Sequence, residues 1–241
     1  MKDFTAGIKY FFRGFKTVLR PGLWPYLALP LLIGAVTYSG IIWFAVTRFN
    51  RLMDALMPQG DAWYLAIAGG LLWVVFAVLI LIIMFFTFVM VMNILASPFN
   101  GLLSEKVEVQ VCGAEARELG WGQRLREFGI VFLGELKKYA YFLMIATIIL
   151  IITFIPLLNF VSPLLWFLFG SWMLAAEYVA YPMNNHGKVF REVRQQLQKH
   201  RLLTYGLGTA AFVLFWIPLL NFFVMPAAVA GGTLLWYERI R

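Results

Sequence analysis

The sequence predicts an all-α integral membrane protein that forms a single membrane domain over residues 1–241. Hydrophobic residues make up 62% of the chain and charged residues only 13%, well below the share of about a quarter that is usual in soluble domains. Several uncharged runs exceed the roughly 20 residues that a helix needs to cross a bilayer. The longest charged segment, 105–138, is too short for a separate soluble domain.

The first part of the chain predicts one interfacial helix and two transmembrane helices. In 2–20, apolar and basic residues recur at helical spacing on opposite faces, which is typical of a helix that lies along a membrane surface. The apolar face is Phe4, Ile8, Phe11, Phe15 and Leu19, and the basic face is Lys9, Arg13, Lys16 and Arg20. The basic face is expected either to anchor the helix at lipid headgroups or to gather anions at a pore mouth. Residues 24–47 and 62–96 are uncharged or nearly so and long enough to cross a hydrocarbon core of about 30 Å.

A helix boundary is expected at Ser97-Pro98, close to the point where the longest uncharged run ends. Serine followed by proline is typical of a helix start, because serine accepts from the first amides and proline at the first position loses no hydrogen bond. One helix should therefore end near Ala96, and a charged helical segment should cover 98–138. The first turn of that segment would carry unpaired amides and a partial positive charge, which favours an anion.

The hexapeptide IPLLNF occurs twice, at 155–160 and at 217–222, each time inside a long apolar segment. Prolines divide these segments, 139–181 and 202–237, into pieces that are short or borderline for a full crossing. If each segment crossed once, the basic loop 184–201 would oppose the positive-inside tendency. We therefore expect two proline-broken, partly penetrating helical hairpins that turn at IPLLNF, with an amphipathic helix over 184–201 between them. Tight turns between six ordinary helices at the far surface remain the alternative.

The composition argues against several other classes of protein. One cysteine excludes an internal disulfide, and two histidines with one cysteine far apart in sequence predict no metal site. No phosphate-binding GxxxxGK[ST] motif and no nucleophile–base arrangement occur, so we expect no enzyme activity and no cofactor. The net charge of +8 is spread over loops beside membrane segments, which predicts contact with the lipid bilayer rather than with nucleic acid.

Several segments together resemble the CysZ-type sulfate permease family of bacterial inner membranes. The resemblance covers nearly the whole chain and is carried by FFRGFKTVLRPGL, SPFNGLLSEKVE, YPMNNHGKVFREVR and IPLLNFFVMPAAVAGGT, in this order. It implies channel-like sulfate uptake for cysteine biosynthesis, without ATP hydrolysis by the protein itself. It also implies an all-helical homo-oligomer with two long crossing helices and two pairs of partly penetrating helices.

The resemblance further implies an anion site at the turn before the first crossing, where many relatives have a basic pair directly after Pro-Gly-Leu. In this chain, PGL at 21–23 is followed by WP. The backbone amides of Gly22 and Leu23 could still donate hydrogen bonds to sulfate, and Arg20 is the nearest cation.

A sulfate path would need hydrogen-bond donors and few fixed cations, because a strongly hydrated dianion must pass without being trapped. The residues suited to such a path are Asn93, Ser97, Asn100, Lys106, Asn159 and Asn221. The alternative for the asparagines and the serine is local capping of a helix end or turn.

Four further titratable residues could act along the path. Glu105 and Glu108, together with Lys106, could form a gate-like charge network; the alternative is a solvated first helical turn. His186 is a candidate pH sensor, with a turn hydrogen bond as its alternative role. Glu177 is expected to pair with a cation of 184–201 or to line the path.

A membrane scaffold or assembly protein without transport activity is the alternative function. The aromatic share of 17% and the amphipathic ends would suit a docking surface.

Overall fold

The protein is all-α in the computed structural model, which describes residues 2–56, 63–113 and 121–241. No strand occurs among these residues, and four helices are long and apolar enough to cross a membrane. The predicted fold class, an all-α membrane protein, is confirmed. The chain divides into two compact units, a larger one formed by Met1–Leu27 and Asn100–Arg241 and a smaller one formed by Ala28–Phe99.

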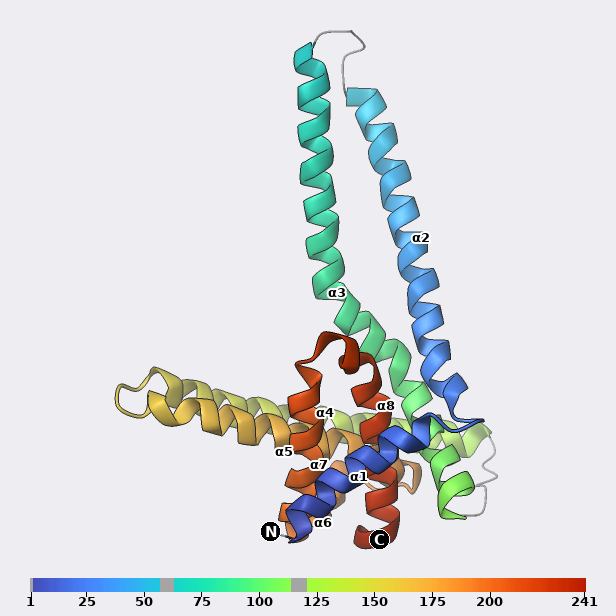
Figure 1. The fold of residues 1–241 in the computed structure, drawn as a ribbon, viewed down its shortest axis with the longest axis vertical. Helices are drawn as coiled ribbons and strands as arrows, with labels where there is room; N and C mark the ends of the chain where they lie inside the picture. The colour runs from blue at the N-terminus through green and yellow to red at the C-terminus, as the bar shows by residue number, and fades with distance from the viewer. Residues whose placement is uncertain (1, 57–62, 114–120) are drawn as a thin grey trace. The chain divides into compact units, whose positions relative to one another are not determined.

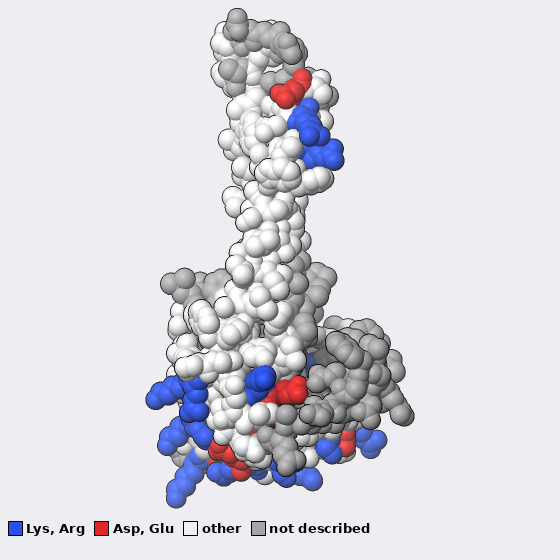
Figure 2. Space-filling model, turned by 90° about the vertical axis from the view of Figure 1, so that its right-hand side faces the viewer, with Lys and Arg blue, Asp and Glu red and all other residues white. Residues whose placement is uncertain are grey.

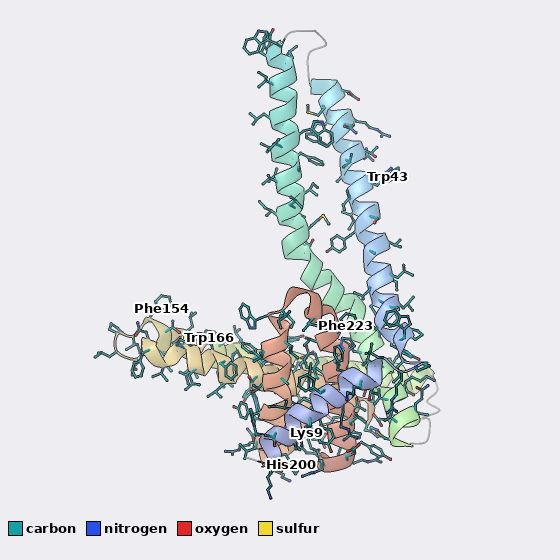
Figure 3. All side chains as sticks on the ribbon, viewed as in Figure 1. Lys9, Trp43, Phe154, Trp166, His200 and Phe223 are labelled. Atoms are coloured by element: carbon teal, nitrogen blue, oxygen red, sulfur yellow. The ribbon has the colours of Figure 1, made fainter. Side chains whose placement is uncertain are left out.

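The smaller unit consists of most of α2 (Trp24–Leu56) and the first part of α3 (Trp63–Cys112). Phe49 of α2 stacks on Phe76 of α3 with 4.0 Å between ring centroids. Large apolar side chains point outward along both helices, as Trp43 does at 70% exposure (Figure 3). The charged side chains that the structure describes here are near one end of the unit, and its surface is otherwise uncharged on the face drawn in Figure 2. Such a surface is suited to lipid.

The helix ends in this region differ from those expected. α2 continues to Leu56 rather than ending at 47, and α3 runs without a break from Trp63 to Cys112 rather than ending near Ala96. Apolar composition indicates where a helix is dry, whereas backbone hydrogen bonding can continue into polar residues. Ser97-Pro98 therefore does not start a new helix. A membrane helix tolerates an internal proline although the proline removes one backbone hydrogen bond. The expected segment 98–138 is divided between the end of α3 and the start of α4.

The larger unit is built around α5 (Ser162–Asn185), α7 (Arg201–Phe215) and α8 (Pro218–Leu235), with α1 (Lys2–Val18) lying across α7 and α8 (Figure 1). Glycines allow α1 to approach α7 and α8 closely. A methyl group at Gly7 of α1 would overlap the carbonyl oxygen of Leu203, and one at Gly14 would overlap that of Ala227.

The face of α1 that packs on the protein differs from the apolar face expected from the sequence. Its buried residues are Gly7, Tyr10, Phe11, Gly14, Thr17 and Val18. Of the predicted apolar face, only Phe11 is among them, and Leu19 is 52% exposed. Backbone-to-backbone packing selects small residues, so the contact face follows the glycines rather than the phenylalanines.

The two copies of IPLLNF adopt different structures. The first lies in the turn between α4 (Trp121–Phe154) and α5, where Leu157 has a φ of 71° and a 3₁₀ turn covers Asn159–Val161. In the second copy the chain turns at Trp216 and Ile217, and the following proline already begins α8. Proline suits the first turn of a helix. α5 begins at Ser162, beyond the end of the first copy, whereas α8 begins at Pro218, inside the second.

The remaining elements are α6 (Phe190–Lys199), an amphipathic helix, and a terminal π-helical turn over Trp236–Ile240. Of the helical segments in the two hairpins, Lys137–Phe154 and Asn159–Asn185 are long enough to span a membrane, and Arg201–Phe215 is shorter. Partial penetration of the hairpins stays a prediction.

Candidate functional site

The turn between α1 and α2 is closed by two backbone hydrogen bonds. The amide of Arg20 donates to Thr17 O over 3.0 Å, and the amide of Leu23 donates to Arg20 O over 3.1 Å. The Leu23 amide is therefore not available to an anion in this conformation, and the Leu23 side chain is fully buried. Arg20 remains exposed, so its guanidinium is accessible to an anion.

Gly22 gives this turn its shape. Its φ of +90° is a conformation that side chains with a Cβ rarely adopt, and a Cβ here would lie 3.2 Å from Nε2 of Gln110. The carboxamide of Gln110, from the end of α3, is thus held beside the turn. Gly22 and the Gln110 carboxamide lie side by side and are exposed, and the exposed Arg20 precedes Gly22 by two residues. A backbone amide, a side-chain amide and a guanidinium are the kinds of donor that an oxyanion needs.

A second group of polar side chains forms a buried stripe on α3. Asn100, Ser104 and Glu108 recur every four residues, so they share one face of the helix, and all three are buried. Asn100 Nδ2 is 3.5 Å from Tyr181 Oη, and Ser104 Oγ is 2.9 Å from Thr233 Oγ1. We call Asn100, Ser104 and Glu108 the polar stripe.

Glu108 of the polar stripe forms an acid–base pair with His186. Glu108 Oε2 is 2.7 Å from His186 Nε2, with 6% and 24% of the two side chains exposed. Among the described residues, no hydrogen-bond partner exists for the buried Glu108 Oε1. Burial raises the pKa of Glu108, because desolvation disfavours the carboxylate, although the hydrogen bond from His186 opposes this effect. The imidazole also lies 4.7 Å from the ring of Trp236.

The remaining predicted site residues lie apart from this stripe or outside the described side chains. Lys106 is exposed and Glu105 is half-buried, whereas Glu108 is buried and pairs with His186. The charge network of Glu105, Lys106 and Glu108 stays a prediction. Asn159 is exposed at the end of the α4–α5 hairpin. The side chains of Asn93, Ser97 and Asn221 lie outside the described residues.

Several polar residues of the site were not predicted from the sequence. Ser104 could have been found from the four-residue spacing that starts at Asn100. Thr233, Tyr181 and Asn185 carry no such signal, although Asn185 Nδ2 donates to Gly101 O over 3.0 Å. The expected partner of Glu177 was a cation of 184–201.

The partner of Glu177 is instead Lys138 of α4, with 2.6 Å between Nζ and Oε2. Lys138 is almost completely buried and Glu177 is 30% exposed, so this partly buried ion pair joins α4 to α5.

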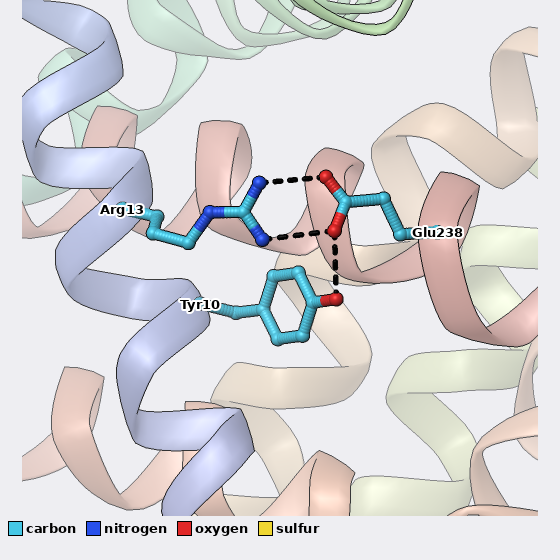
Figure 4. A network of polar contacts seen from close by, with 3 residues as sticks. All are labelled: Tyr10, Arg13 and Glu238. Atoms are coloured by element: carbon cyan, nitrogen blue, oxygen red, sulfur yellow. Dashed lines mark hydrogen bonds and ion pairs between the residues drawn. The ribbon is translucent and has the colours of Figure 1, made fainter.

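A separate cluster fastens α1 to the C-terminal turn (Figure 4). Arg13 donates two hydrogen bonds to the carboxylate of Glu238, at 2.7 and 2.8 Å, and Tyr10 Oη donates a third at 2.8 Å. The guanidinium of Arg13 lowers the pKa of Glu238. This clamp fixes the rotation of α1 on the rest of the larger unit.

A family model described as "Sulfate transporter CysZ/Etoposide-induced protein 2.4" matches residues 10–226. The chain belongs to this family. A relative from Pseudomonas paraeruginosa is 40% identical over 96% of this chain and 94% of its own length. One from Pseudomonas fluorescens is 40% identical over 96% and 92%, and one from Pectobacterium atrosepticum is 34% identical over 98% and 86%. Each of these relatives is named sulfate transporter CysZ.

Membership of the CysZ/EI24 family confirms the resemblance inferred from the sequence motifs. Together with the four candidate membrane helices, it identifies a multi-pass membrane protein. Among the described residues, no group of three or more His, Cys, Asp or Glu side chains could hold a metal ion.

Proposed function

We propose that this chain is a channel-like sulfate permease of a bacterial inner membrane, and that it supplies sulfate for cysteine biosynthesis. The observation that carries the proposal is the near full-length similarity to proteins named sulfate transporter CysZ. The donor groups at the α1–α2 turn and along α3 suit the same substrate, because sulfate in a membrane needs hydrogen bonds in place of its water.

The α1–α2 turn is proposed as the first anion-binding place. Arg20 supplies the positive charge, while the Gly22 amide and Gln110 Nε2 supply neutral donors. One cation with two amides gives weaker binding than a basic pair would, which suits conduction, because a permeating ion must also leave.

The polar stripe on α3 is proposed as part of the path in a closed state. Its hydrogen-bonding groups pair with Tyr181, Thr233 and His186. For sulfate to pass, these side chains must break their hydrogen bonds to one another and form hydrogen bonds to the ion. A charged Glu108 would repel the dianion, so we assign it to gating rather than to binding.

We also propose that the protein works as a homo-oligomer. The α4–α5 hairpin ends in exposed apolar side chains, with Phe154 at 79% and Leu157 at 86% exposure (Figure 3). Neighbouring copies could cover part of this surface, and lipid could cover the rest.

Radiolabelled sulfate uptake into proteoliposomes tests the function. Wild-type protein should give flux well above that of empty vesicles. Replacing Arg20→Gln or Gln110→Leu should weaken apparent sulfate affinity by about tenfold, since each removes a hydrogen bond to an anion. The matched controls are Arg191→Gln and Gln195→Leu, which change exposed residues of the same types on α6.

Flux equal to that of empty vesicles, with a control anion channel active in the same preparation, would contradict the transport function. It would favour the alternative of a membrane scaffold or assembly protein, for which the exposed end of the α4–α5 hairpin would be the docking surface. Equal effects of the turn variants and their controls would remove the turn from the proposed path while leaving the function intact.

A further inference from the structure

Helix α1 has three distinct faces, and one of them holds all of its buried residues. At about 100° per residue, the buried residues centred on Gly7 and Gly14 form the face on α7 and α8. Next to it lies an apolar face formed by Phe4, Ile8, Phe12 and Phe15, none of them fully buried. A third face, which we call the basic stripe, is formed by Lys2, Lys9, Arg13 and Lys16, all within an arc of about 60°.

The orientation of these faces is set by contacts within the larger unit. Gly7 and Gly14 approach the backbone of α7 and α8, and the clamp between Arg13 and Glu238 holds the helix against rotation. The apolar face therefore cannot turn inward to bury itself. Phe12 remains 50% exposed, so this face needs an apolar partner from outside the chain.

The basic stripe carries three lysines whose charge no described acidic residue pairs with. Arg13 is paired with Glu238, and the nearby Asp3 lies 3.7 Å from Arg239. Among the residues that the structure describes, Lys2, Lys9 and Lys16 have no acidic partner within salt-bridge distance, and all three are exposed. Three ammonium groups thus lie beside a partly exposed apolar face.

We propose that α1 is a binding surface for anionic phospholipids. Acyl chains would cover the apolar face, and lipid phosphates would pair with Lys2, Lys9 and Lys16. Free sulfate would use only the cations, whereas a phospholipid uses both neighbouring faces. The side-by-side arrangement of the two faces therefore favours lipid as the occupant.

Helix α6 provides an internal comparison. It also carries exposed cations, Arg191 and Lys199, but its apolar residues Phe190, Val193 and Leu197 are all buried in the protein. It has charge without an apolar face beside it, so it should not select phospholipids in the same way.

Native mass spectrometry of the full-length protein in detergent tests this proposal. Phosphatidylglycerol and phosphatidylcholine with identical acyl chains are titrated separately. Wild-type protein should bind phosphatidylglycerol more tightly, and Lys2→Gln/Lys9→Gln/Lys16→Gln should weaken that binding about tenfold or more while leaving phosphatidylcholine binding unchanged. The charge-matched control Arg191→Gln/Lys199→Gln/Arg201→Gln and the charge-preserving Lys2→Arg/Lys9→Arg/Lys16→Arg should both keep wild-type preference.

Unchanged phosphatidylglycerol binding in Lys2→Gln/Lys9→Gln/Lys16→Gln, or an equal loss in the control Arg191→Gln/Lys199→Gln/Arg201→Gln, would overturn the proposal. Sulfate flux is measured in parallel in vesicles made of phosphatidylcholine only. Arg20 is intact in the variant, so its flux there should equal that of wild type. A loss of flux there would instead identify the basic stripe as a surface that gathers sulfate, and it would overturn lipid binding as its role.

Discussion

Two glutamates of this protein show how local surroundings determine the behaviour of the same side chain. Glu108 is buried beside one imidazole, and desolvation raises its pKa. Glu238 accepts three hydrogen bonds from Arg13 and Tyr10, and the guanidinium lowers its pKa. Glu238 therefore stabilises the fold above the usual glutamate range and loses this effect as the pH falls through its lowered pKa. Glu108 has the opposite dependence.

We predict that Glu108→Gln makes the protein relatively more stable as the pH rises. Because its folded-state pKa is raised, Glu108 favours the fold when protonated, and this contribution is lost as the pH rises through that pKa. Glutamine does not titrate. The melting temperature of the variant relative to wild type should therefore be higher at about pH 8 than at about pH 5. The change should be a few degrees, as expected for roughly 1 kcal/mol in a chain of this size.

Glu192→Gln is the matched control for that experiment. The backbone amide of Val189 lowers the pKa of Glu192, so its contribution should stay constant between about pH 5 and pH 8. A relative stability of Glu108→Gln that falls with rising pH would show that His186 stabilises the carboxylate more than burial disfavours it, and a constant one would show that the two effects balance.

At the scale of elements, glycines decide how α1 is placed. Gly206 of α7 faces the backbone of Phe4 and Gly7, and Gly231 of α8 faces that of Tyr10. These contacts allow helices to approach more closely than side chains with a Cβ would permit. Small residues alone do not fix the rotation of α1 about its own axis. The hydrogen bonds of Arg13 and Tyr10 to Glu238 add this specificity.

We predict that Gly206→Ala destabilises the larger unit. A methyl group at Gly206 would overlap the carbonyl oxygen of Phe4, and such overpacking typically costs about 1–3 kcal/mol. Thermal unfolding in detergent measures the effect. The matched control is Gly40→Ala in α2, where nothing lies within 4 Å, and alanine should stabilise the helix by about 0.5–1 kcal/mol. Equal responses of the two variants would argue against close packing of α1 on α7.

The repeated hexapeptide is another property of elements. The same six residues form a turn with a left-handed leucine in one copy and mostly helix in the other. The difference follows the position at which the next helix begins, after the first copy at Ser162 and inside the second at Pro218. Similarity of local sequence therefore predicts a chain reversal near each copy, but not its geometry.

At the scale of the whole molecule, the distribution of basic residues predicts the topology. The N-terminal segment, 105–138 and 184–201 should share one side of the membrane, while the end of α2 should lie on the other. The structure describes the helices of each unit, and the depth of the hairpins in the bilayer is a separate property that labelling can measure.

We predict opposite accessibility for two single cysteines introduced into a Cys112→Ser background. Arg51→Cys, near the end of α2, should react with a membrane-impermeant maleimide added outside intact cells. Gln195→Cys, on the exposed side of α6, should react only after the membrane is permeabilised. Labelling of both cysteines from outside would mean that the α4–α5 segment crosses the membrane once, and it would contradict both the hairpins and the six-helix alternative, which keep 184–201 on the side of 105–138.

The sequence by itself determined the fold class, the membrane location and the apolar segments, because these depend on composition and on the length of uncharged runs. It also placed Asn100 and Glu108 among the polar residues of interest. Only the tertiary structure showed that Glu108 meets His186, 78 residues away, and that Arg13 meets Glu238, 225 residues away. It also showed that α3 continues through Ser97-Pro98. Periodicity reports which residues share a face of one helix, whereas the partner of that face depends on how closely the helices approach and how they are rotated.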